Sequence, residues 1–154
     1  MISKTRTIFG RAVGLSLFVF ALSACTNVGP HSSQLTPEQA IFRAADAAPA
    51  PVPGTFVMTV KAVGSQNGIA YLNSELDYRD QRNLSIAICP DAIAPLAAKF
   101  GGDLDKVLIG KTVAVSGAAM RFKIVFTING APTEKYYYQT HVDVCSAGQI
   151  SLQR

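Results

Sequence analysis

A short charged segment contains the residues with the clearest capacity for chemistry. It carries two carboxylates and two guanidinium groups, at Asp77, Arg79, Asp80 and Arg82. Carboxylates can hold a divalent cation and arginines can neutralise phosphate oxygens, so this set is compatible with metal-dependent phosphodiester cleavage. However, all four residues fall in one connection, and charges of alternating sign are typical of solvated or ion-paired surfaces. We therefore expect a charged loop that contributes to ligand binding, with a metal-dependent phosphodiesterase or nuclease as the alternative.

Tyrosine is the residue type that most favours a binding surface. The chain has five tyrosines, and aromatic rings on strands can stack on bases or sugars, although strand propensity also selects tyrosine. Tyr71 and Tyr137 are candidates for ligand contact, together with His141, which alternation places on the same strand face as Tyr137. The other histidine, His31, lies in a different segment, so a histidine-based metal site or nucleophile relay lacks partners.

Motifs that would indicate an enzyme are missing from this sequence. We find no serine or cysteine nucleophile pattern, no phosphate-cradling glycine loop and no Cys/His set with metal-ligand spacing. The expectation is therefore a binding protein without catalytic residues, metal or cofactor.

Alternating hydrophobicity predicts a mainly β domain over residues 54–154 that positions the candidate residues. One helix, ended by Gly101-Gly102, is expected between the third and fourth strands. Asn129-Gly130 marks a turn, and Pro132 favours a loop of more than two residues. Gly117 favours a bend or bulge within the fourth strand. The expected strands are residues 56–63, 69–73, 84–88, 112–128 and 135–144, the expected helix is 91–100, and residues 149–152 form a short terminal strand or extension.

Residues 1–24 have the three parts of a secretion signal, namely a basic start, an apolar run and small residues before Cys25. The apolar run is shorter than the roughly 20 residues of a spanning helix, so we favour cleavage over an uncleaved anchor. The tetrapeptide Leu22-Ser23-Ala24-Cys25 resembles the lipobox of bacterial lipoproteins. This resemblance implies that Cys25 is acylated, for example with palmitate, and anchors the chain to an envelope membrane. Thr26, where an Asp would favour inner-membrane retention, implies the outer membrane, facing the periplasm.

The mature chain that this cleavage would leave has little net charge. The whole sequence has 14 basic and 10 acidic residues, but residues 1–24 hold three of the basic ones and none of the acidic ones. The remaining charge of +1 and the absence of a basic cluster make nucleic acid an unfavourable partner. Residues 25–53 are rich in Pro and Ala, which predicts a tether. Thr36, Pro37 and Gln39 form a helix-start pattern within it, and a docked helix and a transient one both remain open.

The expected order of elements is that of an OB-fold, a five-stranded Greek-key barrel with one helix between the third and fourth strands. Residues 64–88 and 109–117 resemble OB-fold domains of uncharacterised exported bacterial proteins. The staphylococcal-nuclease class uses such a barrel, but its signature is absent here. The resemblance implies a binding module, and we expect an envelope protein or a glycan as its partner. In this fold the third and fifth strands are parallel neighbours, so Cys89 and Cys145 would lie at the same end. We expect them to form a disulfide in an oxidising compartment, with two free buried thiols as the alternative.

Overall fold

The structure is a computed structural model, and it describes residues 34–153. The expected signal segment, the lipobox and His31 lie outside these residues. The predicted mainly β class is confirmed, because one mixed sheet of eight strands dominates the described chain. The elements are β1 (Gln34–Leu35), α1 (Pro37–Ala47), β2 (Val52–Thr59), β3 (Ala62–Gln66), β4 (Ile69–Asn73), β5 (Leu84–Ile88), α2 (Pro90–Phe100), α3 (Leu104–Val107), β6 (Thr112–Ile128), β7 (Ala131–Val144), the 3-10 turn Ala147–Gln149 and β8 (Ile150–Leu152).

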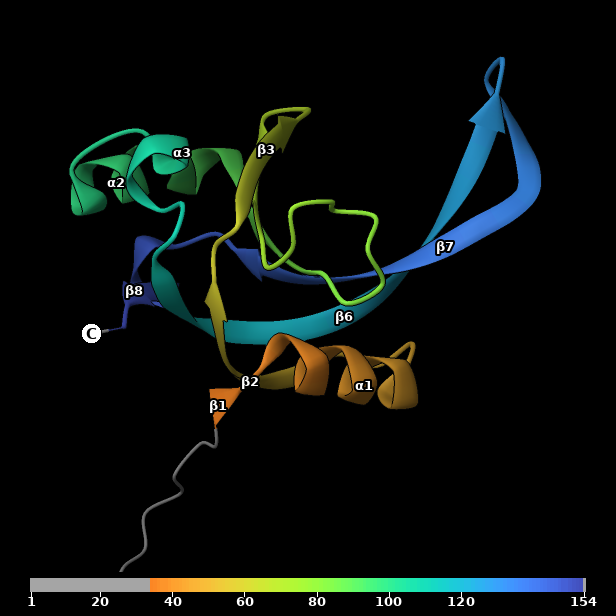
Figure 1. Ribbon diagram of the computed structural model, residues 1–154, viewed down its shortest axis with the longest axis horizontal. Helices are drawn as coiled ribbons and strands as arrows, with labels where there is room; N and C mark the ends of the chain where they lie inside the picture. The colour runs from red at the N-terminus through yellow and green to blue at the C-terminus, as the bar shows by residue number, and fades with distance from the viewer. Residues whose placement is uncertain (1–33, 154) are drawn as a thin grey trace, which may run out of the picture. The chain divides into compact units, whose positions relative to one another are not determined.

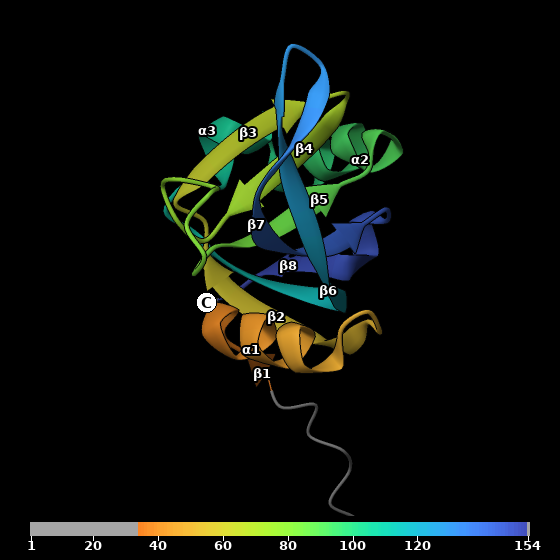
Figure 2. The same ribbon diagram turned by 90° about the vertical axis from the view of Figure 1, so that its right-hand side faces the viewer.

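The strands follow the order β1-β2-β6-β7-β5-β4-β3, with β8 paired to β6. β1 with β2 and β5 with β7 are parallel, and the other pairs are antiparallel. β2 and β3 lie at distant places in this order, yet only Val60 and Lys61 separate them in the chain. The sheet must therefore curl to bring these two strands together, as the two views show (Figures 1 and 2).

Eight strands replace the five that we expected, and the single helix of the expected barrel is joined by others. The expected first strand is divided at Val60, whose N–H donates to the carbonyl of Lys111, while the next residue, Lys61, donates to Asn73. The backbone thus changes its hydrogen-bond partner at this point, from the segment that leads into β6 to the end of β4. β1 and α3 have two and four residues, which is too short for hydrophobic periodicity to reveal them. β8, with three residues, corresponds to the short terminal strand or extension expected at residues 149–152.

Helix α1 is docked against the sheet. The sequence left a docked helix and a transient helix open, and the structure shows the docked one. Thr36 and Gln39 form the predicted capping box, with Gln39 N 3.3 Å from Thr36 Oγ1 and Thr36 N 3.0 Å from Gln39 Oε1. Ala40 and Ala44 are fully buried in the same core as Phe56. The segment from residue 34 to 53, which we expected within the tether, is therefore part of the packed unit.

β6 and β7 continue past the rest of the sheet as a two-stranded ribbon. β2 pairs with β6 only as far as Ala119, and β5 pairs with β7 only from Thr140 onward. We call the projecting residues 121–139 the arm, and Figure 1 shows it leaving the unit on the side away from α2 and α3. Its turn is the two-residue Asn129-Gly130, with φ of 53° and 80°, so the expected longer loop was wrong. Both residues tolerate positive φ, which suits a tight hairpin.

Candidate binding face

The register of three neighbouring strands gathers polar side chains on one face of the sheet. Asn73 of β4 is the partner of Ser85 of β5, which is the partner of His141 of β7. Side chains of directly paired residues project from the same side of a sheet. They contribute to a concave site of about 610 Å³, which we call the binding face. Its lining residues are Gly64, Ser65, Gln66, Tyr71, Asn73, Tyr78, Ser85, Ile124, Tyr137, Gln139 and His141.

Three of the candidates chosen from the sequence meet in this site, namely Tyr71, Tyr137 and His141. Tyr71 and His141 are in edge-to-face contact, with ring centroids 5.8 Å apart. Asn73 and Ser85 were missed, because each looked like an ordinary strand residue and only the register between strands makes them neighbours. Gln139 had a usable signal, since alternation places it between Tyr137 and His141 on the same face.

A buried polar network forms the floor of the binding face. The Asn83 amide donates to Asn73 Oδ1 at 3.0 Å and to Ser85 Oγ at 2.9 Å, and Ser85 Oγ donates to Asn73 Oδ1 at 2.8 Å. Asn73 is 4 % exposed. Within residues 34–153 its Nδ2 donates to no acceptor, and no fully buried side-chain polar atom there lacks a partner. The Asn73 amide nitrogen is therefore not fully buried, and since Asn73 lines the site, we expect this nitrogen to donate to a ligand there.

A ladder of three side chains runs along β7. His141 Nε2 lies 2.8 Å from Gln139 Oε1, and Gln139 Nε2 donates to Tyr137 Oη at 2.9 Å. Because the amide oxygen of Gln139 can only accept, the proton of His141 is on Nε2. Tyr137 accepts from Gln139, so its own hydroxyl hydrogen is available to a ligand. Burial raises the pKa of Tyr137 and lowers the pKa of His141, although Asp143 opposes the second shift. Both groups are therefore neutral near pH 7.

The binding face is uncharged and rich in aromatic rings. Phe122 of β6 contacts His141 with ring centroids 5.0 Å apart, and Phe126 contacts Tyr137 at 5.4 Å. No Asp, Glu, Lys or Arg is among the residues that line the site. Aromatic surface combined with a few fixed polar groups is the usual composition of a small-ligand site.

The charged loop does not contribute its charges to this lining. Asp80 pairs with Arg82 at 2.7 Å, and the hydrogen bonds from Arg82 lower the pKa of Asp80 to about 2. Asp77 Oδ1 accepts from the backbone N–H of Arg79 at 2.9 Å, which closes a local turn. The Arg79 guanidinium lies 4.9 Å from the ring centre of Tyr78, which lines the site. Across residues 34–153 no three potential ligand side chains gather into a metal-binding group.

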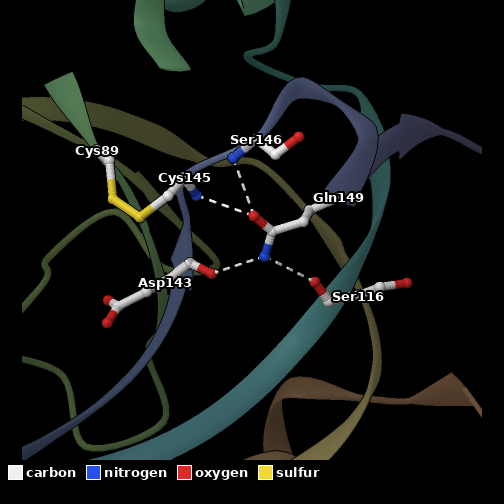
Figure 3. Close-up of a disulfide and its surroundings, with 6 residues drawn as sticks. All are labelled: Cys89, Ser116, Asp143, Cys145, Ser146 and Gln149. Atoms are coloured by element: carbon white, nitrogen blue, oxygen red, sulfur yellow. Dashed lines mark hydrogen bonds between the residues drawn. A yellow bond between two sulfur atoms is a disulfide. The ribbon is translucent and has the colours of Figure 1, made fainter. Parts of the chain in front are cut away.

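The predicted disulfide between Cys89 and Cys145 is present, with Cα atoms 4.8 Å apart. The parallel pair β5 and β7 ends at Ile88 and Val144, so the two cysteines follow neighbouring strands as the resemblance implied. Beside the disulfide, Gln149 ties β7 to β6 (Figure 3). Its Oε1 accepts from the N–H groups of Cys145 and Ser146, both at 2.9 Å, and its Nε2 donates to the carbonyls of Ser116 and Asp143, both at 3.1 Å. These links hold the end of the strand that carries His141.

Comparison with known proteins identifies no family for this chain. No family model and no curated protein matches it. Similar solved structures include one described as an aspartyl-tRNA synthetase of Leishmania major Friedlin, with 11 % identity and a TM-score of 0.46 over 82 % of this chain. Another is the aspartyl-tRNA synthetase of Entamoeba histolytica, with 10 % identity and a TM-score of 0.39 over 71 % of this chain. The chain spans about a fifth of each of these proteins, 22 % and 20 %. Within residues 34–153 no helix is long and apolar enough to cross a membrane.

Proposed function

We propose that this protein is a binding module of the bacterial cell envelope and that its binding face takes an uncharged glycan. The observation that carries the proposal is the chemistry of the lining, which combines aromatic rings with amides and hydroxyls and contains no charge. A sugar offers apolar C–H faces to rings and many hydroxyls to amides. The open Asn73 amide and the Tyr137 hydroxyl supply two donors of the kind such a ligand needs.

An OB-fold-like architecture is part of this proposal. If β2 and β3 are taken as one bent strand, the pairing order supports a Greek-key arrangement in which β4, β5, β6 and β7 serve as the second to fifth strands. OB-folds bind oligonucleotides and oligosaccharides on their second and third strands and on adjacent loops. The binding face uses β3, β4, β5, the loop that connects β4 and β5, the arm and the adjoining part of β7. Its lack of charge favours a neutral sugar polymer over a nucleic acid, whose phosphates require basic groups.

The envelope location rests on the lipobox-like segment that ends at Cys25. We propose that acylation of Cys25 attaches the mature chain to the periplasmic side of the outer membrane. The Cys89–Cys145 disulfide supports an oxidising compartment, since such bonds are rare in the cytosol. We do not propose a phosphodiesterase as a second function, because the carboxylates of Asp77 and Asp80 are already engaged inside their own loop.

Binding to an array of neutral bacterial glycans, followed by calorimetry with a positive sugar, tests the proposal. Gly64→Leu should abolish binding, because a side chain at Gly64 enters open space within the site and meets no atom within 4 Å. Tyr71→Ala should weaken binding by roughly 5-fold or more, if one stacked ring contributes at least about 1 kcal/mol. Phe42→Ala is the matched control, since Phe42 is an exposed aromatic residue of α1 outside the site. The proposal fails if Gly64→Leu binds sugars as the wild type does, or if no neutral glycan binds.

A further inference from the structure

The face of the arm opposite the binding face carries a pair of stacked cations. In the ribbon, Lys123 is the partner of Tyr138 and Arg121 is the partner of Thr140. Their side chains therefore project together, on the side opposite Tyr137 and His141. Each cation stacks on the tyrosine diagonally across. Arg121 Cζ lies 3.6 Å from the ring centre of Tyr138, and Lys123 Nζ lies 4.1 Å from that of Tyr136. We call this set the basic face of the arm.

The two cations have no carboxylate partner within residues 34–153. The salt bridges of this region involve Lys61, Arg82 and Lys106 instead. Stacking leaves the N–H groups in the plane of the Arg121 guanidinium free, in the fork geometry that fits a phosphate or carboxylate. The rings of Tyr136 and Tyr138 meet edge to face with centroids 5.5 Å apart, which restricts the movement of the groups stacked on them. Fixed, unpaired cations of this kind suit the binding of an anion.

A groove beside these cations contains an unsatisfied hydroxyl. Its volume is about 300 Å³. Its lining residues are Ile41 and Ala45 of α1, Gln81, Arg121, Thr140 and the tyrosines Tyr136, Tyr137 and Tyr138. Thr140 is 4 % exposed, yet its hydroxyl forms no hydrogen bond within residues 34–153. Because no fully buried side-chain polar atom there lacks a partner, this hydroxyl is not fully buried, and Thr140 is one of the residues that line the groove. It lies on the residue directly paired with Arg121, so both can donate to the same ligand.

We propose that the basic face of the arm is a binding site for a phosphate-bearing ligand, separate from the glycan site. One phosphate group accepts hydrogen bonds from the Arg121 guanidinium and the Thr140 hydroxyl. Lys123 lies two residues along β6, about 6.6–6.8 Å away on the strand repeat, and interacts with the outer side of that phosphate or with a second one. The phosphate can belong to a soluble ester or to a phospholipid headgroup. Tyr137 borders both hollows, but Arg121, Lys123 and Thr140 project from the other side of the ribbon, so this proposal does not depend on the proposed glycan binding.

Two probes distinguish these sources. The chain from residue 25 onward, carrying Cys25→Ser so that no lipid is attached, contains the whole packed core of residues 34–153. Inorganic phosphate is titrated while the backbone amide signals are followed by NMR. Separately, the protein is sedimented with vesicles of phosphatidylcholine that contain either no phosphatidylglycerol or one fifth of it. Perturbation of signals at Arg121 and Thr140 by phosphate alone indicates a soluble ligand, whereas vesicle binding that requires phosphatidylglycerol indicates a headgroup. Either result supports the site, and neither probe binding overturns it.

Variants test whether anion binding depends on the basic face or only on the net charge of the protein. Arg121→Gln and Lys123→Gln should each weaken binding about 5-fold, on the basis of roughly 1 kcal/mol for each basic residue near an anionic surface. Thr140→Val should also weaken it, and Thr140→Ser should restore it by returning the hydroxyl. Lys135→Gln removes one charge from the opposite side of the same arm and should have little effect. If Lys135→Gln weakens binding as much as Arg121→Gln does, the effect is one of net charge and the proposal is wrong.

Discussion

His141 links the binding face to the pH dependence of stability. Burial lowers its pKa in the folded chain, so near pH 6 the unfolded chain binds more protons at this residue. The free energy of unfolding should therefore fall as the pH drops below about 6.5, the ordinary pKa of histidine. Urea denaturation at pH 7.5, 6.5 and 5.5 measures this loss. His141→Gln should reduce it, because the variant removes the imidazole whose pKa is lowered in the folded chain. Equal curves for the wild type and His141→Gln would contradict the prediction.

The position of a residue in the site could be predicted where it depends only on alternation along a single strand. Alternation along β7 placed Tyr137 and His141 together, and they do meet in the site. Asn73 and Ser85 depend on which strands are neighbours and in what register, and local periodicity does not contain that information. Gly117 was interpreted as a bend or bulge, but β6 passes through it in regular register. The glycine is needed because a Cβ there would lie 2.7 Å from Val142 Cγ1.

Helix α1 is the element whose role changes most, from a possible transient helix to a packed part of the core. Ala44→Leu should lower the free energy of unfolding by about 1–3 kcal/mol, because extra methyl groups at a fully buried position overfill the core. Arg43→Leu adds the same side chain at the neighbouring exposed position and should change stability by less than about 0.5 kcal/mol. Urea denaturation of both variants measures the difference. Equal stabilities would mean that α1 does not contribute to folding in solution.

The elements that sequence analysis predicted well are those with a strong local signal. β5 alternates, α2 ends at Gly101 with a φ of 82°, and the Thr36 capping box marks the start of α1. The continuation of β6 and β7 into a free ribbon could not be predicted in the same way. Its residues bury no single face, so their hydrophobic pattern does not indicate what they pack against. Tyr136 and Tyr138 fall two residues apart in the predicted strand 135–144, but the stacking of Arg121 and Lys123 on them depends on the register of the hairpin. The turn was misjudged because Pro132 was taken to exclude pairing next to Asn129-Gly130.

At the scale of the whole molecule, docking of α1 shortens the segment between the proposed anchor and the folded unit. Only residues 26–33 separate Cys25 from β1, and eight extended residues reach at most about 30 Å. We had expected a much longer tether, so docking of α1 places the folded unit nearer to the proposed membrane.

We predict that Cys25→Ala moves the protein from the membrane fraction to the soluble periplasmic fraction, because the acyl chains can no longer attach. Thr26→Ser keeps the cysteine and should leave the protein in the membrane fraction. Intact-mass measurement of the purified mature protein should reveal the added acyl mass. An unmodified thiol at Cys25 would rule out the anchor. The predictions for the glycan site and for the basic face would still stand, because neither depends on the anchor.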